Sequence, residues 1–117
     1  MKFSKELIKG STKGLVLAAI GDNEMYGYQI IKVIKERSSD ALAFGEGSIY
    51  PALHALEKDG LVESKWLAQE NLPDRKYYSL TDKGRSKLKT EVAEWKEFTE
   101  AVNGIYSGIS KKLLLAD

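Results

Sequence analysis

The 117-residue chain contains no cysteine, a single histidine and two prolines. Without cysteine it forms no disulfide, no thiolate nucleophile and no cysteine-ligated metal site. His54 alone excludes a zinc site made only of histidines within one chain. No glycine-rich phosphate loop and no paired catalytic carboxylates are recognisable. We therefore expect a protein that is not an enzyme and that holds no metal or cofactor.

Long apolar runs are also missing. The longest, residues 15–20, is too short for a signal-peptide core or a membrane span. We therefore expect a cytoplasmic protein that has no membrane partner. Its composition, 43% hydrophobic and 30% charged, is typical of a folded globular chain, and its length fits one domain with at most one appended element.

The net charge of +1 is low for a nucleic-acid-binding protein, but the charges are unevenly distributed. Residues 1–14 carry four lysines against one glutamate, whereas residues 91–117 carry five acidic residues against three lysines. Two interpretations of the acidic end are open: an element kept away from phosphates, or an ordinary solvated helix face.

Hydrophobic spacing and turn residues predict a mainly α-helical fold with one small β-hairpin. The expected elements are helices over residues 7–20, 25–37 and 48–59, strands over 61–67 and 75–80 around a hairpin tip at 68–74, and a long helix from Thr81 onward. Ile49, Leu53 and Leu56 form the inner stripe of the third helix. Gly27 lies inside a helical pattern, where it is unfavourable, and a close helix crossing would explain it.

The last helix carries an apolar stripe at nearly heptad spacing, with one irregular step near Trp95. Thr81 is its expected N-cap, although Gly84 weakens its first turn. The stripe is longer than a small domain covers alone, so the helix is expected to pair with a second copy. The stripe consists of Leu88, Val92, Trp95, Phe98, Val102, Ile105 and Ile109. We expect a winged helix-turn-helix domain over residues 1–80 and a dimerisation helix over 81–117.

The predicted order of elements is that of winged helix-turn-helix proteins, in which the third helix enters the major groove and the hairpin reaches the adjacent backbone. Three segments resemble the PadR family of bacterial repressors: Y-G-Y-Q-I at 26–30, G-S-I-Y-P-A-L-H-A-L-E-K-D-G-L-V at 47–62, and R-K-Y-Y-S-L-T-D-K-G at 75–84. The resemblance covers residues 9–108. After residue 108 only a short tail remains, and in this the chain resembles the compact branch of the family, which has a short C-terminal dimerisation helix. Members often have a glycine-rich wing tip, whereas residues 71–74 here are N-L-P-D.

The resemblance and the chemistry of the side chains together suggest a DNA-contacting set. Hydroxyl, imidazole and cationic groups are suited to phosphates and base edges. The candidates are Tyr28, Ser48, Tyr50, His54, Lys58, Arg75, Lys76 and Tyr78. For Tyr28 and Tyr50 the alternative is core packing, and for His54 and Lys58 it is plain solvent exposure. Strand alternation sends Arg75 and Lys76 to opposite faces, and likewise Tyr77 and Tyr78.

In drug-binding members of the resembled family, a tryptophan at the place of Trp95 lines a pocket at the dimer interface. Phe98 of the same helix and Lys13, Leu15 and Ala19 of the first helix are candidates to line that space. The alternative is that Trp95 is simply a bulky interface residue.

The leading hypothesis is therefore a homodimeric repressor that binds an inverted-repeat operator in double-stranded DNA and is released by a planar aromatic or hydrophobic ligand. The alternative is a winged-helix protein–protein interaction module without DNA binding, which the low net charge favours.

Overall fold

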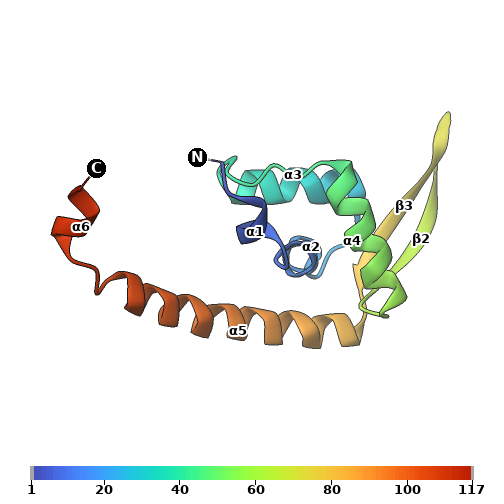
Figure 1. Ribbon diagram of the computed structural model, residues 1–117. Coiled ribbons are helices and arrows are strands. Elements are labelled where there is room, and N and C mark those ends of the chain that lie inside the picture. Colours follow the sequence, from blue (N-terminus) through green and yellow to red (C-terminus); the bar gives the residue numbers. More distant parts are fainter. Residues whose placement is uncertain (1, 117) are drawn as a thin grey trace.

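The computed structural model describes residues 2–116, so Met1 and Asp117, the outer ends of the two predicted parts, lie outside the described residues. The elements in chain order are α1 (Lys5–Ile8), α2 (Thr12–Ile20), β1 (Met25–Tyr26), α3 (Gly27–Arg37), α4 (Glu46–Lys58), β2 (Val62–Gln69), β3 (Leu72–Leu80), α5 (Asp82–Tyr106) and α6 (Lys111–Leu115). Figure 1 shows α2, α3 and α4 grouped together, the β2–β3 hairpin projecting at one end, and α5 running along one side and beyond the group. The predicted winged helix-turn-helix fold with a long C-terminal helix is confirmed. Over residues 2–116, no helix has both the length and the apolarity that crossing a membrane would require.

The single N-terminal helix predicted over residues 7–20 is wrong. The chain forms α1 and α2 instead, because Gly10 between them has a φ of +89°, which a right-handed α-helix does not accommodate. The Ser4 hydroxyl caps α1 by accepting the Leu7 N–H. Apolar side chains of α2, Val16 and Ile20 among them, are fully buried.

The predicted start of the second helix at Met25 is also wrong. Met25 and Tyr26 form β1 and pair antiparallel with Tyr78 and Tyr77 of β3, giving a three-stranded sheet of order β1-β3-β2. The helix α3 begins only at Gly27, and the Gln29 side chain accepts the Tyr26 N–H at its start. Pairing with a distant strand thus overrides a local helical pattern.

The hairpin is longer than predicted. Residues 68–74 were expected to form its tip, but the strands continue to Gln69 and Leu72, and only Glu70 and Asn71 turn. Asn71 has a φ of +59°, which asparagine tolerates better than most residues, so it serves where glycine often stands. Pro73 lies in β3 beyond the short region that β1 covers, where its missing N–H breaks no pairing with β1.

The core lies between α2, α3, α4 and the sheet, and it includes the predicted stripe of Ile49, Leu53 and Leu56. The junction of α5 with this core depends on Gly84. Thr81 caps the helix by accepting the Gly84 N–H, and its hydroxyl donates to the Gly60 carbonyl at 2.6 Å. A Cβ on Gly84 would overlap the Leu61 carbonyl, so this glycine brings α5 close to the body.

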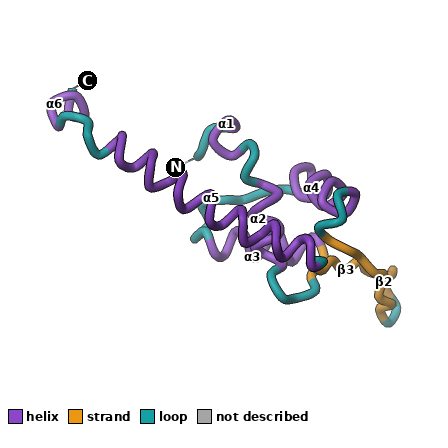
Figure 2. Tube along the Cα trace, turned by 90° about the horizontal axis from the view of Figure 1, so that it is seen from below, coloured by secondary structure: helices purple, strands orange, loops and turns teal. Residues whose placement is uncertain are grey.

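The distal half of α5 extends away from the body, as Figure 2 shows. Its apolar side chains are largely exposed in the single chain: Val92 60%, Trp95 57%, Phe98 59% and Ile105 76%. The helix ends at Tyr106, so Ile109, which was predicted to continue the stripe, lies in the segment before α6. That part of the prediction is wrong. Leu113, Leu114 and Leu115 of α6 are exposed as well.

Candidate nucleic-acid interface

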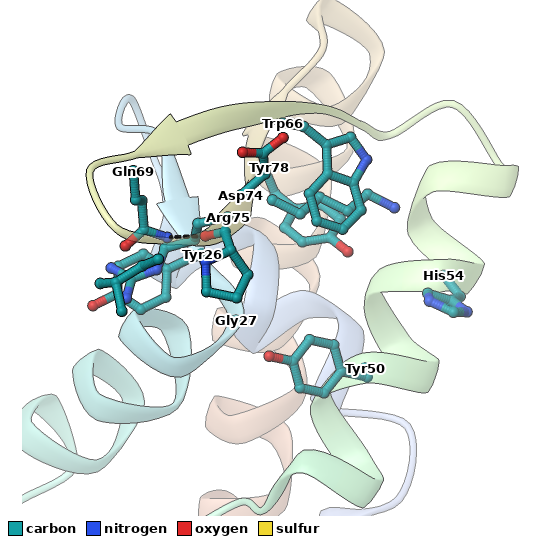
Figure 3. A pocket seen from close by; sticks show the side chains of 12 residues that line it. Tyr26, Gly27, Tyr50, His54, Trp66, Gln69, Asp74, Arg75 and Tyr78 are labelled. Atoms are coloured by element: carbon teal, nitrogen blue, oxygen red, sulfur yellow. Dashed lines mark hydrogen bonds between the residues drawn. The ribbon is translucent and has the colours of Figure 1, made fainter.

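A cleft of about 590 Å³ separates α4 from the inner face of the hairpin, and we call it the wing cleft (Figure 3). Its floor is the start of α3, and its walls come from α4 and the two hairpin strands. It is lined by Tyr26, Gly27, Tyr50, His54, Trp66, Gln69, Leu72, Pro73, Asp74, Arg75, Lys76 and Tyr78. Aromatic rings and cationic groups are therefore combined on a concave surface beside the predicted recognition helix α4.

Tyr50 projects from α4 with its hydroxyl toward Gly27 at the start of α3 (Figure 3). A Cβ on Gly27 would lie 2.6 Å from the Tyr50 hydroxyl oxygen and 2.7 Å from Cζ. Gly27 thus permits a close approach between the two helices, made by a side chain rather than by the helix backbones. Burial, the neighbouring Glu46 carboxylate and Tyr78 together raise the pKa of Tyr50, so its hydroxyl stays protonated and able to donate a hydrogen bond.

Arg75 is a lining residue of the cleft, and its side chain lies on the opposite face of β3 from that of Lys76. Its Cζ lies 3.9 Å from the ring centroid of Tyr26, and Tyr26 in turn makes an edge-to-face contact with Tyr77 at 5.5 Å. Within the described residues no carboxylate lies at ion-pair distance from Arg75. The aromatic pair therefore orients a guanidinium whose charge is free to meet a phosphate.

Lys76 faces the opposite way, as the strand alternation predicted. Its Nζ lies 3.4 Å from Oε1 of Glu57 on α4, and 5.9 Å and 5.3 Å from the ring centroids of Trp66 and Tyr78. Glu57 also accepts a hydrogen bond from the Ser64 hydroxyl on β2. A phosphate contact by Lys76 would have to compete with this carboxylate.

The environment shifts both members of this ion pair toward their charged forms. The Ser64 hydrogen bond and the nearby Lys76 hold the pKa of Glu57 below its usual value, against a smaller opposing effect of burial. Burial by itself would lower the pKa of Lys76, but Tyr78 and Glu57 more than offset it and raise that pKa.

The other proposed DNA contacts are placed differently from one another. Tyr28, Ser48, His54 and Lys58 are exposed, and His54 joins Tyr50 in the wing cleft, whereas Lys58 does not line it. Tyr78 is only 2% exposed and belongs to the core. Strand alternation turns Tyr78 inward, where it also lines the wing cleft, and leaves Tyr77 half-buried on the other face. The DNA contact of Tyr78 stays a prediction.

The residues proposed to bind a ligand fall into two groups. Leu15 and Ala19 border a groove of about 170 Å³ between α2 and α3, and Lys13 nearby is exposed. Trp95 and Phe98 lie together on α5 with their ring centroids 6.2 Å apart. Neither α5 aromatic lines the groove, so a single chain does not bring the two groups into one cavity.

Sequence reasoning missed Glu57 and Ser64. One signal was present, because Glu57 stands seven residues after Tyr50 and therefore on the same flank of α4. Strand alternation places Ser64 and Trp66 on one face of β2, opposite Tyr78 and Lys76 of β3. The hairpin residues that face α4 could therefore have been predicted from the sequence.

Comparisons with known proteins match residues 16–90 to the model of the transcriptional regulator PadR-like family. A PadR-like transcriptional regulator from Bacillus cereus is 32% identical, with a TM-score of 0.75 over 90% of this chain and 100% of that chain. A transcriptional regulator from Clostridium thermocellum is 26% identical, with a TM-score of 0.79 over 87% of this chain and 96% of that chain. The negative transcriptional regulator PadR of Bacillus subtilis is 29% identical over 76 residues, which are 65% of this chain and 42% of that protein.

Proposed function

Because the chain belongs to the PadR-like family of DNA-binding transcriptional regulators, we propose that it is a homodimeric repressor whose wing cleft receives the sugar–phosphate backbone of operator DNA. Proteins of this family regulate transcription and are not enzymes. Our proposal adds to this family role the residues that contact DNA, the homodimer, repression rather than activation, and release by an effector ligand.

The wing cleft supports the proposed path of the DNA backbone. In a winged helix-turn-helix complex one element occupies the major groove and the wing lies at the adjacent backbone, so the intervening strand passes between them. Here Tyr50, His54 and Arg75 all line that space, and the Arg75 guanidinium lies at its edge, against Tyr26. The single observation that carries the proposal is the oriented Arg75, which has no carboxylate partner among residues 2–116. The exposed side chains of Tyr28, Ser48 and Lys58 would add contacts outside the cleft.

The exposed stripe of α5 supports the proposed dimer. Burying one large apolar side chain contributes roughly 1.5–3 kcal/mol, so leaving Val92, Trp95 and Ile105 in water is costly unless a partner covers them. Leu88 and Val102 complete the proposed seam and are partly buried already. Residues 1–80 would then bind DNA and residues 81–117 would dimerise. Two copies of α4 would meet half-sites about 34 Å apart on an inverted repeat.

Relief of repression would require a ligand that prefers a conformation of the dimer unsuited to DNA. Trp95 and Phe98 supply exposed aromatic faces, and Leu15 and Ala19 border an apolar groove. We propose that a planar aromatic compound binds where these two groups meet across the interface, since stacking on aromatic rings suits such ligands.

The test of this function is the salt dependence of duplex DNA binding, measured by fluorescence anisotropy between 50 and 200 mM salt. Each neutralised phosphate contributes about 0.9 to the slope of log K against log salt, so Arg75→Gln should reduce the slope by about 0.9. Arg37→Gln is the matched control, because Arg37 is exposed at the far end of α3 and does not line the cleft. An affinity that is negligible or independent of salt would refute the DNA-binding interface and favour a protein–protein module.

A further inference from the structure

We propose that Glu57 is a specificity-determining residue of the wing cleft: it pairs with Lys76, keeps this lysine away from DNA phosphates, and so weakens binding that is independent of sequence. This role rests on the proposed DNA-binding function. A phosphate contact strengthens binding to any sequence, whereas Glu57, an acidic residue of the recognition helix, would weaken such binding.

The carboxylate of Glu57 joins α4 to both strands of the hairpin. One oxygen accepts the Ser64 hydroxyl from β2, and the other lies 3.4 Å from the Lys76 ammonium on β3. The side chains of Lys76 and Glu57 are 27% and 35% exposed, so solvent screens this pair less than an open surface pair. Glu57 therefore fixes the position of the wing and balances the charge of Lys76 at the same time.

The ammonium of Lys76 has further partners in the wall of the cleft. It lies 5.3 Å from the Tyr78 ring centroid and 5.9 Å from that of Trp66, and both rings attract a cation. Its neighbour Arg75 stacks on Tyr26 and lacks a carboxylate partner in residues 2–116. Two adjacent cations thus differ in availability: Arg75 is open to a phosphate, and Lys76 is neutralised within the protein.

This difference bears on specificity because contacts with phosphates carry no sequence information. A regulator selects its operator from a large excess of competing sites, so the ratio of specific to non-specific affinity matters more than either value. Each phosphate contact that is withheld lowers non-specific affinity and its salt dependence. The low net charge of +1 is consistent with a protein that limits such contacts.

The test is the salt dependence of binding to a duplex of arbitrary sequence by Glu57→Gln. Glutamine keeps the size of the side chain and can still accept the Ser64 hydroxyl, but it removes the charge that holds Lys76. We expect the slope to increase in magnitude by about 0.9, so that between 50 and 200 mM salt the affinity falls by a further factor of about 3.5 relative to the unmodified chain. Glu63→Gln is the matched control, because Glu63 is an exposed acid of the same hairpin that makes no ion pair within residues 2–116.

The double variant Glu57→Gln/Lys76→Gln removes both charges and should restore the original slope, since the intact pair contributes no net charge. A double-variant slope about 0.9 below that of the unmodified chain would show that Lys76 already contacts a phosphate, and would overturn the proposal. An unchanged or reduced slope in folded Glu57→Gln, checked by circular dichroism, would overturn it as well. If Glu57→Gln does not fold, the double variant decides. Loss of all salt-dependent binding in the unmodified chain would instead refute the proposed DNA-binding function.

Discussion

Replacing Gly84 by alanine should destabilise the protein although alanine is the better helix former. The new Cβ would lie 2.9 Å from the carbonyl carbon of Leu61 and nearer still to its oxygen, whereas carbon atoms in favourable contact are about 3.5–4.0 Å apart. Both sides of this contact are backbone, so α5 or the start of β2 must move. Overpacking of this kind destabilises a protein by up to about 3 kcal/mol, whereas the higher helix propensity of alanine relative to glycine stabilises it by about 1 kcal/mol.

The expected net loss is therefore about 2 kcal/mol in the free energy of unfolding, or roughly 8 °C in Tm for a chain of this size. Urea unfolding followed by circular dichroism measures it. Gly104→Ala is the matched control, since Gly104 lies in the same helix with nothing within 4 Å of the position that the new methyl carbon would take, and the substitution should stabilise the helix by up to about 1 kcal/mol. Equal effects of the two substitutions would refute the argument that close packing requires Gly84.

Three further substitutions or conditions test separate parts of the molecule. Gly27→Ala should change the free energy of unfolding by less than about 1 kcal/mol, because the Tyr50 ring that the new methyl group displaces can swing into the cleft. It should weaken DNA binding about fivefold, which corresponds to the loss of one hydrogen bond from Tyr50. Unchanged affinity in a gel-shift titration would show that Tyr50 does not contact DNA. Val92→Glu places a charge on the exposed stripe of α5, so sedimentation should show a folded single chain where the unmodified protein shows two, and an intact dimer would argue against this seam. Because the pKa of Glu57 is lowered and that of Lys76 raised, their pairing contributes stability throughout neutral pH, and it is lost on the acid side as pH falls through the lowered Glu57 value and on the basic side as pH rises through the raised Lys76 value. Trp66 fluorescence in a Trp95→Phe background should therefore be constant around neutral pH and change only at the extremes, and a transition between pH 6 and 8 would contradict this assignment.

Hydrophobic spacing was sufficient to locate helices whose apolar side chains all lie on one buried face. Ile49, Leu53 and Leu56 define α4 in the sequence, and all three are buried in the structure. The same approach failed where distant pairing decides the conformation. Met25 and Tyr26 continue a helical pattern in the sequence but are held as a strand by Tyr77 and Tyr78, some fifty residues away.

The candidate site was predictable as a set of side chains but not as a network. Alternation correctly placed Arg75 and Lys76 on opposite faces, but it could not indicate that Glu57 neutralises one of them, since that depends on how the hairpin packs against α4. It also left the choice between Tyr77 and Tyr78 open. The packing of the sheet on the core decides that choice by burying Tyr78.

The most direct test of the central claim, that two copies joined along α5 present two recognition helices to one duplex, is selection of bound sequences from a random duplex DNA library. The proposal predicts enrichment of an inverted repeat with half-site centres about one helical turn, roughly 34 Å, apart, bound by two chains per duplex. Enrichment of a lone half-site bound by one chain, or no enrichment of any sequence, would contradict it.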